Sequence, residues 1–559
     1  MSETGLEKHG SNESGIAPSD IDLLTFHEAR AGRLVIDPEE AKVELGEAVA
    51  SRLKLSEDGT KVLWPQPTDS PLDPQNWSSR RKAFQLFIIT LASIVPDFDS
   101  GIGITAVFSL AEQYRTSPNY VNNLTSNWSI FLIGWGGVFV VILIRRYGRL
   151  PILFWSQVLA MLFLLGATLA PNLNTFAAMR CLTGFFGTAP QITVFANSCS
   201  SSVVQIHFQG LYVVTDMYPF HLQARKLNIW TLGFIVSPFL SPFLFGFVVA
   251  RTTWRWAYGA GTIYGGFVCL LIIFFAEETM YDRGVKPIPE PPTTGLRYRV
   301  ETLLGITGIK MAKYRNSWPE AIMSPIRVVW RPHMMGILLF EGAMFGFGIG
   351  IEVTNAVFFG TPPPFGFGFS QYAIAGFYAT PVVAVFVGEF IGRYTNDWIM
   401  NVSIRRNNGI FEAESRLWAC YIAVPLYICG CVVLGAAFQN HLSVGALVMG
   451  WGIAECAIMI NTVAVIAYCS DSFPKHQGEV SAYINLARVL GGKDFTHLIA
   501  FRLKLRGLEG FSVSYFQIPW ALKHGALQVL GVEAAIVAGL FVLVVPFLQL
   551  KGRMLRVGL

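Results

Sequence analysis

The residues of this chain best suited to chemistry are acids within long apolar stretches. The acids at this predicted depth are Asp97, Asp99, Glu341, Glu352, Glu389 and Glu455. An ionisable side chain inside a bilayer helix costs about 2.5–3.5 kcal/mol on insertion scales, so it usually faces a cavity or a partner. Burial favours the protonated carboxyl group, which in a cavity can exchange its proton for a cation. The acids therefore indicate proton or cation binding within a membrane.

Glu341 and Glu352 are spaced to share one face of a helix. They lie eleven residues apart, which is about three turns, and Phe345 and Gly348 fall on approximately the same face. A face that combines acids, a glycine and an aromatic ring is typical of a cavity wall. The alternative is that each acid lies in water at an end of its helix.

Asp97 and Asp99 are spaced to point in different directions. Two residues along a helix turn the side chain by about 200°, so one cavity can receive both only if the helix is broken. Pro96 and Gly101 would permit such a break. We expect at least one of the two aspartates to contact a substrate or a proton. The alternative places both in water, one turn beyond the bilayer.

Glu455 is the acid closest to the middle of its apolar stretch. Its position suits a carboxyl group that exchanges a proton for a cation. The alternative role is a structural ion pair with Arg488, which, like Arg180, lies inside or near the boundary of the predicted bilayer.

The elements that must position these acids are membrane-spanning helices. Only 14% of the 559 residues are charged, against roughly 25% in soluble proteins, and 52% are hydrophobic. A bilayer-spanning helix needs about 20 mainly apolar residues. By that criterion twelve spans are predicted, near residues 83–108, 124–144, 151–170, 175–193, 229–250, 256–276, 334–359, 371–392, 416–437, 444–468, 478–492 and 525–549.

The spans divide the chain into two six-helix halves. The predicted segments are a mostly disordered cytoplasmic tail (1–79), an N-terminal half (80–276), a cytoplasmic loop (277–333), a C-terminal half (334–549) and a cytoplasmic tail (550–559). Lys and Arg are concentrated in the loops that this arrangement places inside, as the positive-inside rule requires. Within the central loop, residues 298–313 alternate basic and apolar residues at helical spacing, which predicts a helix on the membrane surface or an ordinary solvated one.

The sequence lacks the motifs of several other protein classes. It contains no HExxH, no Gly-x-Ser-x-Gly and no Walker loop, because Gly492-Lys493 is followed by Asp494. We therefore expect no metal site, no cofactor and no enzyme activity. A net charge of +5 is modest for this length and does not indicate binding to nucleic acid.

Short motifs occur at fixed places relative to the spans. The loop after the second span reads RRYGRLP (145–151), the fourth span contains RCLTG (180–184), and the fifth contains GFIVSP (233–238). A degenerate copy of the loop motif follows the eighth span at 388–397. In this order the motifs resemble those of the major facilitator superfamily. The residues that the resemblance implicates in conformational change are Arg146, Gly148, Arg149, Gly233, Pro238, Gly388 and Asp397.

The resemblance implies an all-α polytopic fold of twelve transmembrane helices in two pseudo-symmetric halves. It implies a monomeric secondary transporter that moves a small molecule across a lipid bilayer, coupled to protons, with Arg180 as the family's usual coupling arginine. Strings such as DPQNWS (73–78) and DMYPF (216–220) resemble a fungal branch of drug and polyamine proton antiporters. We expect a multi-pass protein of the plasma membrane that carries an organic cation, polyamine or drug. The alternatives are a non-transporting nutrient receptor and a carrier of a neutral or anionic solute.

Two residues depart from the family's motifs. Arg145 stands where the loop motif usually has an acid, and Ser237 replaces the second glycine of the antiporter motif. The resemblance therefore does not imply efflux rather than uptake.

Two polar stretches interrupt predicted helices. The fourth span meets residues 194–209, with four serines and His207, and the eleventh meets residues 493–510, with six charged residues. Unpaired charges at mid-membrane cost about 2.5–3.5 kcal/mol each, so these stretches must leave the bilayer or prevent insertion. We hypothesise that both are unspliced introns translated in frame, since Gly492-Lys493 can be encoded with a GTAAG donor and Gln209 can end in CAG. The alternative is a genuine pair of loops.

Overall fold

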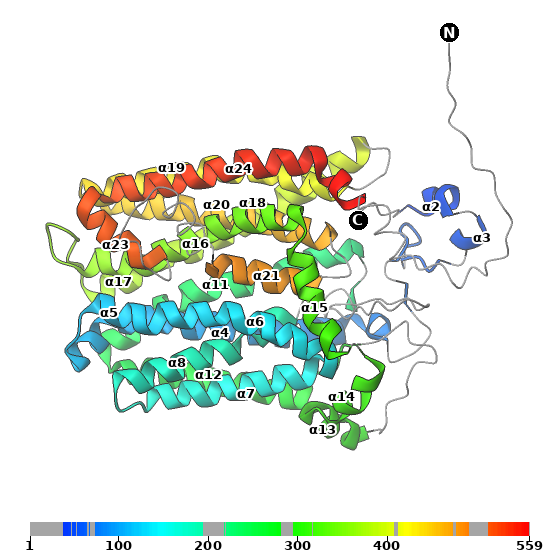
Figure 1. The fold of residues 1–559 in the computed structure, drawn as a ribbon, viewed down its shortest axis with the longest axis horizontal. Coiled ribbons are helices and arrows are strands. Elements are labelled where there is room, and N and C mark those ends of the chain that lie inside the picture. The colour runs from blue at the N-terminus through cyan, green and yellow to red at the C-terminus, as the bar shows by residue number, and fades with distance from the viewer. Residues whose placement is uncertain are drawn as a thin grey trace, which may run out of the picture.

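Long helices run side by side along the longest axis of the molecule (Figure 1). This computed structural model describes residues 37–557 except 46, 52, 57, 64–65, 68–72, 194–216, 219, 281–294, 316, 407–411, 473–476 and 491–512. Before the first long helix it has α2 (Pro38–Leu45) and α3 (Glu47–Ala50). Both lie at the end of the bundle where the last helix finishes.

The N-terminal half is built from eight α-helices and one short π-helical turn within the described residues. They are α4 (Ser79–Tyr114), α5 (Pro118–Asn122), the π-helical turn η3 (Asn123–Asn127), α6 (Trp128–Tyr147), α7 (Arg149–Thr168), α8 (Leu173–Gly187), α9 (Ala189–Thr193), α11 (Phe220–Arg251) and α12 (Trp254–Phe275).

The C-terminal half repeats this plan after a helical linker. The linker holds α13 (Gly295–Leu304), α14 (Ile306–Met311) and α15 (Trp318–Val329). The half contains α16 (Pro332–Gly360), α17 (Gln371–Phe377), α18 (Ala379–Arg406), η5 (Ala413–Ala419), α19 (Cys420–Gln439), α20 (Val444–Ser472), α21 (Gln477–Leu490), α23 (Val513–His524) and α24 (Ala526–Val557).

Ten helices of the described part are long and apolar enough to cross a bilayer. They correspond to all predicted spans except the fourth and the eleventh. The fourth is represented by α8 and α9, which end at Thr193, and the eleventh by α21, which ends at Leu490. The two predicted inserts, 194–209 and 493–510, lie outside the described residues.

Helix ends follow local chemistry. The Ser78 hydroxyl accepts the backbone N–H of Arg81 and so caps the start of α4. Gly148 joins α6 to α7 with φ 98°, a conformation that glycine adopts without steric cost. This glycine belongs to the loop motif, so the backbone conformation explains the residue type at this motif position.

Small residues allow the long helices to pack closely. A Cβ on Gly136 of α6 would lie 2.2 Å from the carbonyl oxygen of Phe185, and one on Gly430 of α19 would lie 2.5 Å from the backbone nitrogen of Ala454. Such contacts are typical of helices packed within membranes.

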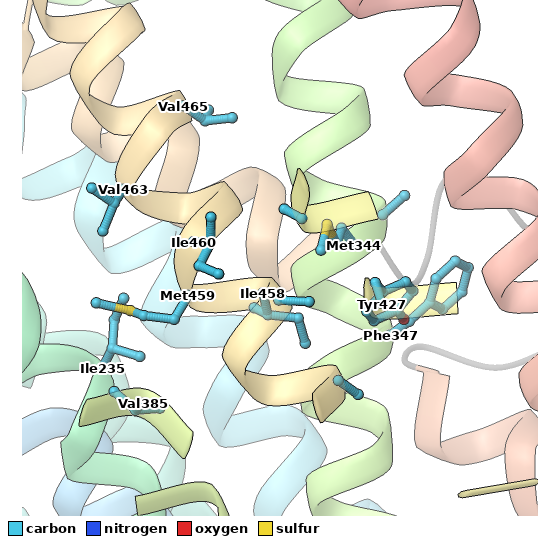
Figure 2. Packing of buried hydrophobic residues seen from close by; sticks show 14 of the residues in the cluster. Ile235, Met344, Phe347, Val385, Tyr427, Ile458, Met459, Ile460, Val463 and Val465 are labelled. Atoms are coloured by element: carbon cyan, nitrogen blue, oxygen red, sulfur yellow. The ribbon is translucent and has the colours of Figure 1, made fainter. Parts of the chain in front are cut away.

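The halves meet along an apolar seam. Helix α6 packs on α21, and α11 packs on α17 and α18. In Figure 2, Ile235 of the N-terminal half lies beside Met459 and Val385 of the C-terminal half. The halves therefore meet through apolar side chains at this point, and these three side chains also line the cavity described below.

The linker helices lie at one end of the bundle (Figure 1). Glu301 of α13 accepts hydrogen bonds from Arg297 Nε at 2.9 Å and from Lys310 Nζ at 2.9 Å. Leu296 and Ile309 of the same two helices remain exposed. The predicted amphipathic segment 298–313 thus forms helices, with a break at Gly305, and its location on a membrane surface stays a prediction.

Candidate functional site

A cavity lies between the two halves and is lined by residues of both. We call it the central cavity. Its polar wall residues are Asp97, Ser100, Ser126, Glu352, Glu455, Asn485 and Arg488. Its aromatic wall residues are Phe234, Phe239 and Phe345. Helices α4, α6 and α11 form one side, and α16, α18, α20 and α21 form the other.

Helix α4 passes through Pro96 without interruption, so the break considered for the two aspartates does not occur. Asp97 consequently faces the central cavity, where its Oδ2 accepts a hydrogen bond from Gln191 Nε2 at 2.7 Å. Asp99 points elsewhere and packs against Gly261, where a Cβ would lie 3.0 Å from its Oδ1. It is 1% exposed, so the alternative that placed both aspartates in water is wrong.

Arg180 supports α4 from behind the cavity. Its Nη1 donates to the carbonyl oxygen of Asp99 at 2.6 Å, and its Nη2 donates to that of Ser100 at 3.1 Å. Its guanidinium carbon lies 5.3 Å from the centre of the Tyr258 ring. Arg180 is buried rather than at a helix end, and it is not a wall residue of the central cavity. Its coupling role stays a prediction, and any such role would act through α4.

Glu341 is held in a polar cluster just outside the cavity. It accepts hydrogen bonds from Asn461 Nδ2 at 2.7 Å, Thr462 Oγ1 at 2.9 Å and Arg488 Nη2 at 3.2 Å. The alternative in which Arg488 pairs with Glu455 is therefore wrong. Glu341 is also only 1% exposed, so the alternative that placed it in water at the end of its helix is wrong.

Glu352 and Glu455 face the cavity from the C-terminal half. Glu455 accepts a hydrogen bond from Trp451 Nε1 at 3.1 Å. Glu352 is 4% exposed, and its Oε1 has no hydrogen-bond partner among the described side chains. Phe345 and Gly348 share this wall, as the spacing from Glu352 predicts. Glu389 is buried on α18 but is not a wall residue.

The halves touch at one end of the cavity through an ion pair. Arg145 of α6 donates to Glu479 of α21, and both side chains are fully buried. The position at which the family motif has an acid is thus occupied by a cation whose partner is an acid on the opposite half. Gln191 adds a second contact at this end, since its Oε1 accepts from Asn485 Nδ2 at 3.2 Å.

Another acid, just after the end of α12, holds the loop motif. Glu278 Oε2 accepts the backbone N–H groups of Arg149 at 3.1 Å and Leu150 at 3.0 Å, and Arg149 Nη1 donates to Thr279 Oγ1 at 2.9 Å. Arg146 lies over the Trp318 ring of α15 at 5.0 Å. The motif residues therefore connect α6, α7 and the linker.

The other motif glycines mark close helix contacts. A Cβ on Gly233 would lie 2.7 Å from Thr90 Cγ2, and one on Gly388 would lie 2.8 Å from the carbonyl oxygen of Cys456. The carbonyl oxygen of Pro238 lies 2.6 Å from the place of a Cβ on Gly101. Asp397 is half-buried further along α18. Their conformational roles stay predictions.

The halves also touch at the opposite end of the cavity. Gln371 Nε2 of α17 donates to the carbonyl oxygen of Thr105 at 3.0 Å, and a Cβ on Gly246 would lie 2.5 Å from that of Ala375. Within the described residues, the halves are therefore in contact at both ends of the cavity.

Comparisons with known proteins agree with this architecture. The model of the Major Facilitator Superfamily matches residues 209–492. The MFS transporter cpaT of Aspergillus oryzae is 24% identical over 80% of this chain and 86% of its own length. The efflux pump radE of Floropilus chiversii is 22% identical over 84% of this chain and 83% of its own. The proton:xylose symporter XylE has a TM-score of 0.54 at 13% identity, over 84% of this chain and 97% of its own.

The fold and the central cavity define a multi-pass membrane transporter rather than an enzyme. Since the family model covers just over half of the chain, the protein belongs to the Major Facilitator Superfamily. It has the family's all-α fold of twelve transmembrane helices in two halves. The likeness to XylE establishes the fold and carries no information about the substrate.

Three polar residues of the site, and one buried acid outside it, escaped sequence reasoning. Gln191, Glu479 and Asn485 gain their partners only through the contact between the halves, which the sequence does not reveal. Glu533 is different, because it lies within the last apolar stretch and meets the same criterion as the six acids that were singled out. A uniform search for acids in apolar windows would have found it.

Proposed function

We propose that this protein is a proton-coupled carrier of an organic cation. The observation that supports this most is the charge of the central cavity. Three carboxyl groups, those of Asp97, Glu352 and Glu455, face it, and the one arginine among its described wall residues is already bound to Glu341. The cavity therefore has an excess of acids over available cations.

The walls favour a cation with an apolar body. Aromatic and aliphatic side chains make up most of the lining around the acids. Cations are attracted to aromatic faces by about 0.5–2 kcal/mol, as the position of Arg488 over the Phe345 ring at 4.4 Å illustrates. An amine or quaternary ammonium group would bind at Glu352 and Glu455, on the side of the cavity formed by α16 and α20.

Proton exchange would follow from competition for the same carboxyl groups. A carboxylate in a low-dielectric cavity is costly without a partner, so it binds either the cationic substrate or a proton. Transport in both directions then requires only that the two halves rock about the central cavity.

Coupling between the cavity and the contacts of the halves would pass through Gln191. Its amide donates to Asp97 and accepts from Asn485 of the opposite half. A proton or cation on Asp97 weakens the charge-assisted hydrogen bond from Gln191. Arg145 and Glu479 would separate in the same movement, when the halves open at that end.

The finer assignments belong to this proposal. We place the protein in the drug and polyamine antiporter branch, as a monomer in the plasma membrane. Relatives named as MFS transporters and as an efflux pump support a carrier of small molecules. The altered antiporter motif at Ser237 leaves the direction of transport to experiment.

The test is flux in liposomes that contain the purified full-length protein. An outward or inward pH gradient is imposed, and movement of radiolabelled spermidine and methylphenylpyridinium is followed. The proposal predicts accumulation that collapses when a protonophore dissipates the gradient. Flux of only neutral or anionic solutes would overturn the cationic substrate, and binding without flux would favour a receptor.

A further inference from the structure

A further carboxylate is buried in the C-terminal half, away from the central cavity. Glu533 of α24 is 1% exposed and is not a wall residue of the cavity. Both of its oxygens accept hydrogen bonds from Gln517 Nε2 of α23, at 3.0 and 3.1 Å. Thr354 Oγ1 of α16 donates to Gln517 Oε1 at 3.0 Å. Three helices thus converge on one acid.

The partners of Glu533 are all neutral. Within the described residues it forms no salt bridge, and Lys523 and His524, the basic residues of α23, are exposed at the end of that helix. A single amide donor does not compensate a carboxylate removed from water, whereas a protonated carboxyl group needs only hydrogen bonds. The packing therefore favours a neutral, protonated Glu533.

Two titratable side chains of α19 lie between the helix of Glu533 and the helix of the cavity acid Glu455. Tyr427 and Cys431 of α19 lie within electrostatic range of both Glu533 and Glu455. Helix α19 packs against both α24 and α20, which carry the two acids. Tyr427 is fully buried in the same apolar cluster as Phe347, and Figure 2 labels both. Helix α19 therefore packs against the helices of both acids.

We propose that Glu533 is a second proton-binding site in the C-terminal half, separate from the substrate-binding carboxyl groups. It holds a proton on a carboxyl group whose hydrogen-bond geometry is fixed by Gln517 and Thr354. Its effect on turnover rests on the proposed function, but its occupancy by a proton does not. The two are therefore tested separately.

The first test is infrared spectroscopy on the purified full-length protein at neutral pH, as the difference between the wild-type spectrum and that of each variant. The protonated carboxyl group of Glu533 contributes a carbonyl band, which Glu533→Gln removes. Gln517→Leu leaves the band present but shifts it, because the carboxyl group loses its amide donor. Loss of a carboxylate band instead, or no change in either variant, would overturn the proposal.

The second test counts protons moved per substrate, from the membrane potential at which flux reverses. Wild type is expected to move one proton more than Glu533→Gln, while Glu389→Gln, a buried acid outside the cavity, matches wild type. Equal proton counts for wild type and Glu533→Gln would overturn the role in turnover. Absence of any proton-dependent flux in wild type would instead overturn the proposed function and leave the infrared result standing.

Discussion

The two halves of the molecule treat their buried acids differently. In the N-terminal half, Asp97 receives an amide hydrogen bond, and Arg180 clamps the backbone beside Asp99. In the C-terminal half, Glu341 takes the available arginine, and Glu352 and Glu455 face the cavity without a cation among the described residues. The difference suggests a division of labour between the halves. The C-terminal half binds the cation, and the N-terminal half responds to it through a change in the charge or hydrogen bonding of Asp97.

The largest effect is expected from the cavity acids. Glu455→Gln or Asp97→Asn should abolish proton-coupled flux or lower it by about 10- to 100-fold, while the protein still reaches the membrane. A hydrogen bond to a charged group contributes about 1.5–3 kcal/mol, and every 1.4 kcal/mol is tenfold. Flux in liposomes measures transport, and surface labelling in cells measures how much of each variant reaches the membrane. Normal transport by both variants would make these acids structural.

The next effect is on stability, and it concerns the fourth and eleventh spans, which the two polar stretches interrupt. If residues 194–209 and 493–510 are translated introns, a chain without them should have unbroken fourth and eleventh spans and higher thermal stability. Sequencing of the messenger is the measurement. Transcripts that retain both stretches and encode a transporting protein would contradict it.

A third effect tests the contact between the halves. Breaking a buried ion pair costs about 3–5 kcal/mol, so Arg145→Glu or Glu479→Arg alone should open that end of the cavity. The double variant restores an ion pair with the charges exchanged and should regain much of the wild-type behaviour. Accessibility of a cysteine placed at Ser481 to a polar maleimide reports the opening. Equal labelling of the single variants and wild type would exclude a closing role for the pair.

The fold was more predictable than the site, for a physical reason. Apolar windows such as 334–359 predicted helices like α16 because a bilayer requires continuous apolar length. The ends of the helices were harder to predict. Helix α18 continues to Arg406, well beyond the apolar window 371–392, because a helix can extend past the apolar part of the bilayer.

The site depends on pairings between distant residues. Glu341 meets Arg488 across 147 positions, and Gln191 meets Asn485 across 294. Nothing in local spacing selects one arginine for one acid, which is why Glu455 was an equally reasonable partner. The helical spacing of Phe345, Gly348 and Glu352 was informative because it needs only one helix.

The smallest effect is expected outside both halves, at the linker. Hydrogen bonds from Lys310 and Arg297 lower the pKa of Glu301, so its contribution to stability is present above the pKa of the unfolded chain. That contribution disappears as the pH falls through the lowered pKa. Glu301→Gln should therefore reduce the melting temperature slightly at neutral pH and not at all in acid. Thermal unfolding at both pH values checks this, and equal losses at both would contradict it.

The most direct test of the division of labour is equilibrium binding of radiolabelled methylphenylpyridinium to the purified protein at neutral pH. We predict that Glu352→Gln combined with Glu455→Gln weakens binding by at least about 100-fold, from the loss of two charged contacts. Asp97→Asn should bind within a few-fold of wild type and lose only proton-coupled flux. Binding that depends on Asp97 and survives the loss of both glutamates would contradict the account.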